Sequence, residues 1–118
     1  MARITITTIG SGGDLFPFVA VGRELRHRGH EVTFAVPPVL KFALARSGFP
    51  VHRIGPPQNH AFANTPGIAD PRWLGARTMR AYWSGVVAPA VRRSAADLDA
   101  VLAADGADLI LAHGYQLA

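Results

Sequence analysis

Residues 4–14, Ile4-Thr5-Ile6-Thr7-Thr8-Ile9-Gly10-Ser11-Gly12-Gly13-Asp14, are the stretch that decides the fold. The apolar run over residues 4–9 predicts a β-strand, and it ends in a glycine-rich turn. Residues 15–28 predict a helix, and residues 31–36 predict a second strand. Strand, glycine turn, helix and strand in this order are typical of a doubly wound α/β domain. In that fold the loop after the first strand faces the ligand crevice, so residues 10–14 are expected to belong to the site.

The first helix has start and stop signals in its own sequence. Asp14 is a candidate N-cap, Pro17 is expected in the first turn, and Gly29 is expected just after the last turn. Gly22 lies on the apolar face, although glycine within a helix costs about 1 kcal/mol against alanine. We therefore expect the helix to approach the sheet closely at Gly22.

Further elements continue the alternation of strands and helices. We expect a short helix over residues 39–47, a third strand over 51–54, a long helix over about 71–104 and a fourth strand over 108–113. Residues 55–70 are rich in proline and glycine without a period, which predicts a mobile loop. Pro89 is expected to kink or split the long helix, because proline lacks a backbone donor and clashes with the preceding turn.

The alternation predicts a parallel sheet with right-handed crossovers, which is a Rossmann-like architecture. By analogy with other doubly wound sheets, the strand order should be 3-2-1-4. The crevice would then open between the ends of strands one and four, where residues 10–14 face residues 113–116. The fourth strand would leave an unpaired edge, which is a template for self-association.

Composition narrows the class of protein. The chain has 118 residues, 49% of them hydrophobic, which fits one packed globule. The formal charge is +4, but the basic residues are spread along the chain, which argues against a nucleic-acid interface. No cysteine is present, which excludes disulfides, thiolate catalysis and cysteine metal sites. Without a visible signal peptide or a membrane-length apolar run, a cytoplasmic protein without a membrane span is expected.

The glycine loop does not match the common nucleotide-binding motifs. The dinucleotide fingerprint is G-x-G-x-x-G. If it is counted from Gly10, its third glycine would stand at position 15, where this chain has Leu15, and no acidic residue follows the second strand. The lysine of a Walker loop is also missing. What remains is a short loop at a helix N-terminus, where backbone N–H groups and the helix dipole favour an anion.

Two titratable residues are candidates for chemistry at the crevice. Asp14 can act as a general base toward a hydroxyl, or it can only cap the helix, and the two roles are compatible. His113 ends the fourth strand on the crevice side, either as a structural hydrogen-bonded residue or as a catalytic one. The five histidines show no metal-ligand spacing, so no metal is expected.

Four aromatic residues have two interpretations each. Phe62 either lines a pocket or pins the mobile loop to the core, and pinning is favoured. Trp73, Tyr82 and Trp83 either stack on an apolar ligand or pack in the core, and core packing is favoured for most of them.

The sequence over residues 10–22 and 25–34 resembles the N-terminal domain of GT-B glycosyltransferases of the family 28 and family 1 type. The antibiotic and sterol glycosyltransferases are most similar, with a Gly-Ser-x-Gly-Asp-x-x-Pro loop and an Arg-Gly-His-x-Val turn. Here these motifs read Gly10 to Pro17 and Arg28 to Val32. Many relatives carry an arginine where this chain has Gly12, which leaves backbone N–H groups as the diphosphate donors.

The resemblance implies what each part of the chain does. Residues 1–118 would be an incomplete acceptor-binding domain, without the donor-binding C-terminal domain. The whole enzyme would transfer a hexose or deoxyhexose from a UDP- or TDP-linked sugar to a hydroxyl of a small lipophilic acceptor. The resemblance assigns Asp14 and His113 to catalysis, Ser11, Gly12 and Gly13 to the sugar diphosphate, and Phe16, Phe62 and Trp73 to the acceptor. No further cofactor is implied.

Two other interpretations remain open. As part of such an enzyme the chain alone is expected to be inactive, because the donor domain is missing. The alternative is a non-enzymatic partner that complements a separate donor-binding chain or oligomerises through its open sheet edge. A small nucleotide-binding domain of another enzyme class is also compatible, but this rests on the fold alone.

Overall fold

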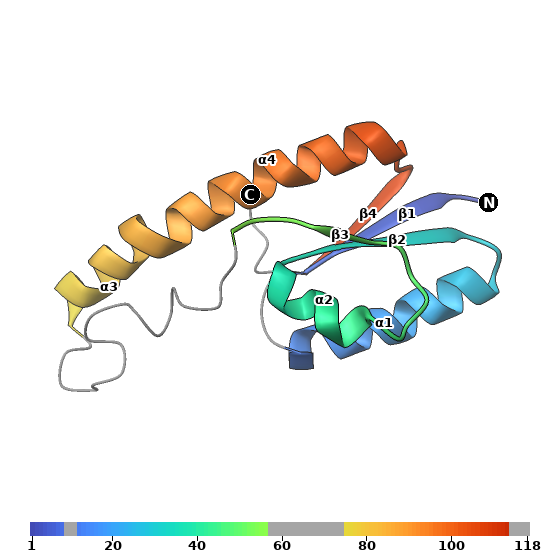
Figure 1. The fold of residues 1–118 in the computed structure, drawn as a ribbon, viewed down its shortest axis with the longest axis horizontal. Coiled ribbons are helices and arrows are strands. Elements are labelled where there is room, and N and C mark those ends of the chain that lie inside the picture. Colours follow the sequence, from blue (N-terminus) through green and yellow to red (C-terminus); the bar gives the residue numbers. More distant parts are fainter. Residues whose placement is uncertain (9–11, 57–74, 114–118) are drawn as a thin grey trace.

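The computed structural model describes residues 1–8, 12–56 and 75–113. Its core is a four-stranded parallel sheet with the order β3-β2-β1-β4 (Figure 1). The strands are β1 (Arg3–Thr7), β2 (Glu31–Val36), β3 (Val51–Arg53) and β4 (Leu109–Ala112). The predicted doubly wound α/β class and the predicted strand order are therefore confirmed.

Helices cover both faces of this sheet. They are α1 (Gly12–His27), α2 (Pro38–Leu44), α3 (Ala76–Tyr82) and α4 (Ala88–Asp105), with a π-helical turn, η2 (Trp83–Val87), between the last two. Figure 1 shows α1 and α2 on one side of the sheet and α4 on the other. In the part of the chain that the structure describes, no helix is both long enough and apolar enough to cross a membrane.

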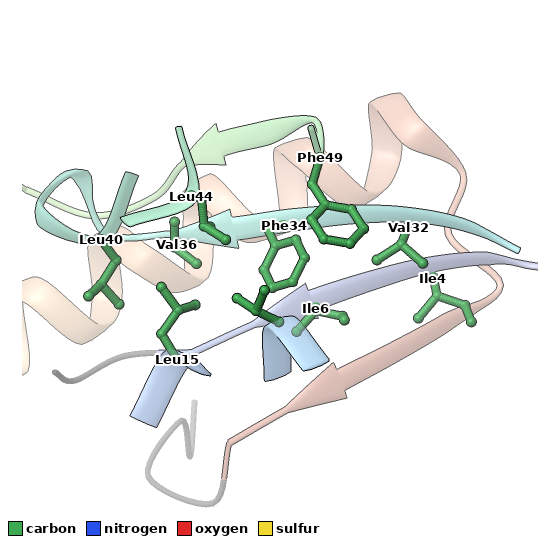
Figure 2. Close-up of a cluster of buried hydrophobic side chains, with 10 residues drawn as sticks. Ile4, Ile6, Leu15, Val32, Phe34, Val36, Leu40, Leu44 and Phe49 are labelled. Atoms are coloured by element: carbon green, nitrogen blue, oxygen red, sulfur yellow. The ribbon is translucent and has the colours of Figure 1, made fainter. Parts of the chain in front are cut away.

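The main core lies between the sheet and the layer of α1 and α2. Alternate residues of β1 and β2 point into it, as expected for strands whose side chains alternate between faces. The buried cluster in Figure 2 consists of Ile4, Ile6, Leu15, Val19, Val32, Phe34, Val36, Leu40, Leu44 and Phe49. At its centre Phe34 is fully buried, and its ring centroid lies 4.9 Å from that of Phe49.

Helix α1 approaches the sheet closely at Gly22, as predicted. A Cβ atom at Gly22 would lie 3.2 Å from Cζ of Phe34 and 3.3 Å from Cδ1 of Ile6. Gly29 follows the helix with φ +90°, and the N–H of His30 bonds to the carbonyl of Leu25 at 3.1 Å. This is the expected glycine C-terminal motif, in which a left-handed residue lets the chain turn into β2.

The start of α1 differs from the prediction in two ways. The helix begins at Gly12, so Asp14 lies within the first turn and is not the N-cap. Pro17 consequently lies inside the helix, where it removes the bond that the carbonyl of Gly13 would otherwise receive. Leu15 and Val19 of this helix are buried in the core, which stabilises the helix despite the low helix propensity of the two glycines at its start.

The predicted long helix continues through α3, η2 and α4, because Tyr82 and Val87 at the two junctions keep a right-handed helical backbone. Near Pro89 the α-helical hydrogen-bond pattern changes to the π-helical one over Trp83–Val87, so the expected kink or split is a local change of helix type. Helix α4 ends at Gly106, whose φ is +63°. The predicted mobile loop lies outside the described residues from position 57 onward, as do residues 71–74 of the predicted helix.

Polar contacts connect α4 to the sheet and to the residues that follow β3. The N–H of Gly55 donates to Oδ2 of Asp97 at 2.9 Å, and Nε2 of His52 lies 2.9 Å from Oδ2 of Asp105. At the C-terminal end of α4 the guanidinium of Arg3 donates to the backbone carbonyl of Asp105 at 3.3 Å. The side chain of His52 is 41% exposed and pairs with α4 at the surface.

Candidate active site

The candidate site lies where β1 and β4 end and α1 begins. The two strands are parallel neighbours, with Thr7 of β1 opposite Ala112 of β4. Their carboxyl ends therefore meet at one edge of the sheet, which is the crevice of a doubly wound fold. Asp14, in the first turn of α1, and His113, one residue after β4, both lie at this edge.

Asp14 and His113 face each other directly. Nε2 of His113 lies 3.8 Å from Oδ1 of Asp14, which is within ion-pair range but longer than a hydrogen bond. The His113 side chain is 24% exposed and the Asp14 side chain is 35% exposed. The pair is thus half-buried, with access from solvent, and the structure brings together the two residues that the sequence singled out for catalysis.

Backbone and ring contacts fix the position of His113. Its N–H donates to the carbonyl of Thr7 at 3.3 Å, which extends the β1–β4 ladder by one residue. The ring of Phe18 meets the imidazole edge to face, with centroids 5.9 Å apart and planes at 70°. His113 is therefore held by a strand bond on one side and an aromatic ring on the other.

Phe18 is a site residue that the sequence analysis missed. It follows Asp14 by four positions, and residues four apart in a helix lie on the same face. The same spacing was available in the sequence, so the i, i+4 relation to Asp14 is the signal that identifies it.

The start of α1 sets the electrostatics around Asp14. The first four N–H groups of a helix have no acceptor within the helix, and the dipole places partial positive charge there. A carboxylate in this turn is stabilised by about 0.3–1 kcal/mol at an exposed site. Gly12 and Gly13 precede Asp14 in the same turn and present backbone without side chains. The same turn therefore suits both the Asp14 carboxylate and an incoming anion.

The arrangement is suited to moving a proton. A carboxylate and an imidazole are the two side chains that most often act as general bases, and here they lie side by side. Catalytic contacts are often long without substrate and tighten when it binds, so 3.8 Å is compatible with a working pair. An acceptor hydroxyl that reaches this edge can lose its proton to the pair.

The other predicted site residues are not brought to the pair. Phe16 is 61% exposed. It follows Asp14 by two positions, which is a rotation of about 200° around the helix axis, so Phe16 lies on the other side of α1 from Asp14. Ser11, Phe62 and Trp73 lie outside the described residues. Trp83 is 63% exposed and does not pack in the core, contrary to the favoured interpretation, while Tyr82 is half-buried.

A cavity of about 270 Å³ lies at a different place, between the starts of β1 and β2 and the end of α4. The charged side chains that line this cavity form two pairs with one another: Arg3 with Glu31 at 3.3 Å, and His52 with Asp105 at 2.9 Å. It is at the opposite end of the strands from the crevice. No group of three or more metal-binding side chains occurs among the described residues.

Comparison with known proteins identifies the family. Residues 4–110 match the model of the glycosyltransferase family 28 N-terminal domain. Over 68 residues the chain is 38% identical to the O-mycaminosyltylonolide 6-deoxyallosyltransferase of Streptomyces fradiae, which covers 58% of this chain and 16% of that protein. Over 116 residues it is 32% identical to an uncharacterized glycosyltransferase of Mycobacterium leprae, covering 92% of this chain and 25% of that protein.

Solved structures agree on the fold. The glycosyltransferase SsfS6 of Streptomyces sp. SF2575 superposes with a TM-score of 0.72 at 20% identity, covering 99% of this chain and 34% of its own. The glycosyltransferase VinC, solved in complex with dTDP, superposes with a TM-score of 0.66 at 24% identity, covering 93% and 29%. The chain thus spans between 16% and 34% of the length of these relatives. It belongs to the glycosyltransferase family 28 N-terminal domain and has the fold seen in antibiotic glycosyltransferases of the GT-B type.

Proposed function

We propose that this chain is the acceptor side of a glycosyltransferase that moves a hexose or deoxyhexose from a nucleotide-diphosphate sugar to a hydroxyl of a small lipophilic acceptor. The observation that carries the proposal is the Asp14–His113 pair, 3.8 Å apart at the crevice edge of the sheet. Family membership supports the reaction type. Two of the similar proteins, a deoxyallosyltransferase and an enzyme solved in complex with dTDP, fit the sugar and nucleotide classes.

In this proposal Asp14 is the general base and His113 orients its carboxylate. The acceptor hydroxyl loses its proton to Asp14 as its oxygen forms a bond to the anomeric carbon of the donor sugar. The bond from that carbon to the diphosphate oxygen breaks, and its electron pair leaves with the nucleotide diphosphate. Because attack comes from the side opposite the leaving group, the configuration at the anomeric carbon inverts.

The donor's diphosphate is assigned to the loop and first turn of α1, through Ser11, Gly12 and Gly13. Support comes from the position of Gly12 and Gly13 at the start of a 16-residue helix, where N–H groups and dipole favour an anion. The sugar donor is UDP- or TDP-linked, and neither a metal nor a further cofactor is part of the proposal. The remaining donor contacts are assigned to a C-terminal domain outside residues 1–118.

The acceptor is assigned to Phe16, Phe62 and Trp73 as apolar contacts, and Phe16, which lies on the other side of α1 from Asp14, would contact a part of the acceptor distant from the reacting hydroxyl. The 61% exposure of Phe16 supports its availability to a ligand. Glycosylation of a natural product or lipid in the cytoplasm belongs to the same proposal. Cell fractionation and product analysis test these two points separately.

A transfer assay on the complete natural polypeptide that carries residues 1–118 tests the function. We expect a glycosylated product, detected by mass spectrometry, with at least one UDP- or TDP-linked sugar and a lipophilic alcohol acceptor. Asp14→Asn should abolish it, whereas Glu24→Gln, the same change on the exposed part of α1, should not. The 118-residue chain alone should show little or no turnover. Failure of every donor to give product would contradict the proposal.

A second candidate is a non-enzymatic partner that complements a separate donor-binding chain or self-associates. The edge of the described sheet favours it, because among the described strands β4 pairs only with β1, and Leu109 and Ile110 are 54% and 46% exposed. Light scattering over a concentration series tests it. Growth of the particle mass with concentration, abolished by Ile110→Lys, would support this candidate, and a monomer at all concentrations would count against it.

A further inference from the structure

We propose that the hydroxyl of Thr8 is a positioning group for the Asp14–His113 pair and donates a hydrogen bond to the Asp14 carboxylate when the pair closes. This inference rests on the proposed transfer reaction and adds a residue to it. Thr8 follows β1 directly and precedes the glycine loop. The proposal is carried by the burial of Thr8, by its place beside His113 and by the distance that still separates the pair.

The hydroxyl of Thr8 is buried without a hydrogen-bond partner. Thr8 is 0% exposed, and its Oγ1 is the one buried side-chain oxygen or nitrogen among the described residues that makes no hydrogen bond. Leaving a buried hydroxyl unbonded is costly, so proteins nearly always pair such groups, and an exception calls for an explanation. Because this chain already encloses Thr8, the partner has to come from the chain itself.

The sheet register places Thr8 beside His113. Ile6 of β1 is opposite Leu111 of β4, and both pack on the side of the sheet that α1 covers. The N–H of His113 donates to the carbonyl of Thr7 at 3.3 Å, so the same register continues just beyond the two strands. Two positions further along, each strand returns to the same face, which sets Thr8 opposite His113. Neighbouring strands are about 4.8 Å apart, so the two side chains are neighbours on the side of α1.

The Asp14–His113 pair is wider than a hydrogen bond. Nε2 of His113 lies 3.8 Å from Oδ1 of Asp14, whereas a hydrogen bond between them would be about 2.7–3.2 Å long. A backbone bond to β1 holds His113, so the carboxylate is the group that has to approach. The first turn of α1 can supply this movement, because Gly12 and Gly13 favour helix weakly and Pro17 removes one of its backbone bonds.

One movement of the carboxylate serves both groups. A carboxylate that approaches His113 also approaches the hydroxyl of Thr8 beside it. An ionised carboxylate accepts several hydrogen bonds at its two oxygens, and a hydroxyl has one proton to donate. Asp14 is then held at two points, by the imidazole and by the hydroxyl, and its remaining lone pairs are available to the acceptor. Holding a general base in one orientation increases the fraction of complexes that can transfer the proton.

Two substitutions of Thr8 in the complete natural polypeptide separate its hydroxyl from its shape. Thr8→Val keeps the shape and should lower kcat about 10–100-fold, which corresponds to the loss of a hydrogen bond to a charged group. Its urea midpoint of unfolding should stay equal or rise, because a buried unbonded hydroxyl is removed. Thr8→Ser keeps the hydroxyl and loses a buried methyl group, so it should retain kcat within about threefold and unfold at a lower urea concentration.

The pH profile of kcat/KM gives a second readout. A hydrogen bond donated to an ionised carboxylate favours the ionised form. Thr8→Val should therefore move the acid limb of the profile to higher pH, by about one unit. The matched control is Thr5→Val, the same change at a buried position of β1 that lies on the opposite face of the sheet. Thr5→Val should leave kcat and the acid limb unchanged.

The outcomes distinguish this inference from the proposed function. Transfer that requires Asp14 but proceeds equally well in Thr8→Val would overturn the inference alone. A joint loss of kcat and stability in Thr8→Val, or an equal loss of kcat in Thr5→Val, would also overturn it, because Thr8 would then be a structural residue. If the unaltered polypeptide transfers no sugar from any donor, the proposed function fails and the inference fails with it.

Discussion

Gly55→Ala is the substitution whose cost the structure predicts most fully. Gly55 follows β3 with φ +77°, a left-handed conformation that costs an alanine about 1–2 kcal/mol. An added Cβ would also overlap Oγ of Ser94, the one buried residue of α4. Relieving such an overlap costs about 1–3 kcal/mol. Together these predict a loss of about 2–5 kcal/mol in the free energy of unfolding.

A double-mutant cycle separates the two costs. Ser94→Ala removes Oγ and leaves its Cβ 3.6 Å from the new Cβ, which is an ordinary contact. In that background Gly55→Ala should cost only the conformational part, about 1–2 kcal/mol. The assay is urea unfolding monitored by circular dichroism. The comparison requires that all variants have the same m-value, which is the slope of the free energy of unfolding against the urea concentration. An equal loss in both backgrounds would refute the close approach of α4 to Gly55, and no loss in either would refute the left-handed conformation.

Three further outcomes are expected. Phe34→Ala should lower the free energy of unfolding by about 3–5 kcal/mol, because Phe34 is fully buried, whereas Phe42→Ala should change it by less than about 0.5 kcal/mol; chemical denaturation measures both. Gly22→Leu should cost about 1–3 kcal/mol by overfilling the space beside Phe34, and a thermal midpoint equal to that of the unaltered protein would contradict this. The hydrogen bond from Arg28, and then its charge, lower the pKa of Glu24, so this pair stabilises the fold above the ordinary pKa of glutamate, and the effect disappears as the pH falls through the lowered pKa. Arg28→Ala should return the pKa of Glu24 to its ordinary range in an NMR titration, and an unchanged titration would argue against the ion pair.

The sheet could be predicted from sequence because its signals are local. The strands over residues 31–36 and 51–53 are short segments that lie between glycine and proline residues and are rich in residues with high β-propensity. Their alternation with helices favours parallel pairing. The strand order was expected by analogy with other doubly wound sheets, whereas the register was not predicted and comes from the structure. The start of α1 was harder to predict, because the two glycines have low helix propensity, yet the helix begins at Gly12.

The site was only partly predictable. Asp14 and His113 were expected together because strand ends meet at one edge, and the structure places them 3.8 Å apart. Phe18 was missed because aromatic residues were assessed one by one, without their helical spacing from Asp14. The exposure of Trp83 was missed because aromatic content alone does not say which side of a helix faces the core.

The steady-state turnover number of sugar transfer in Asp14→Asn, His113→Gln and the double variant tests the central claim most directly. The account predicts that each single change lowers kcat about 10²–10⁴-fold. The double variant should be no slower than the slower single one, because the two residues act as a unit. Retention of kcat within about twofold in both single variants would contradict the claim that this pair removes the proton from the acceptor.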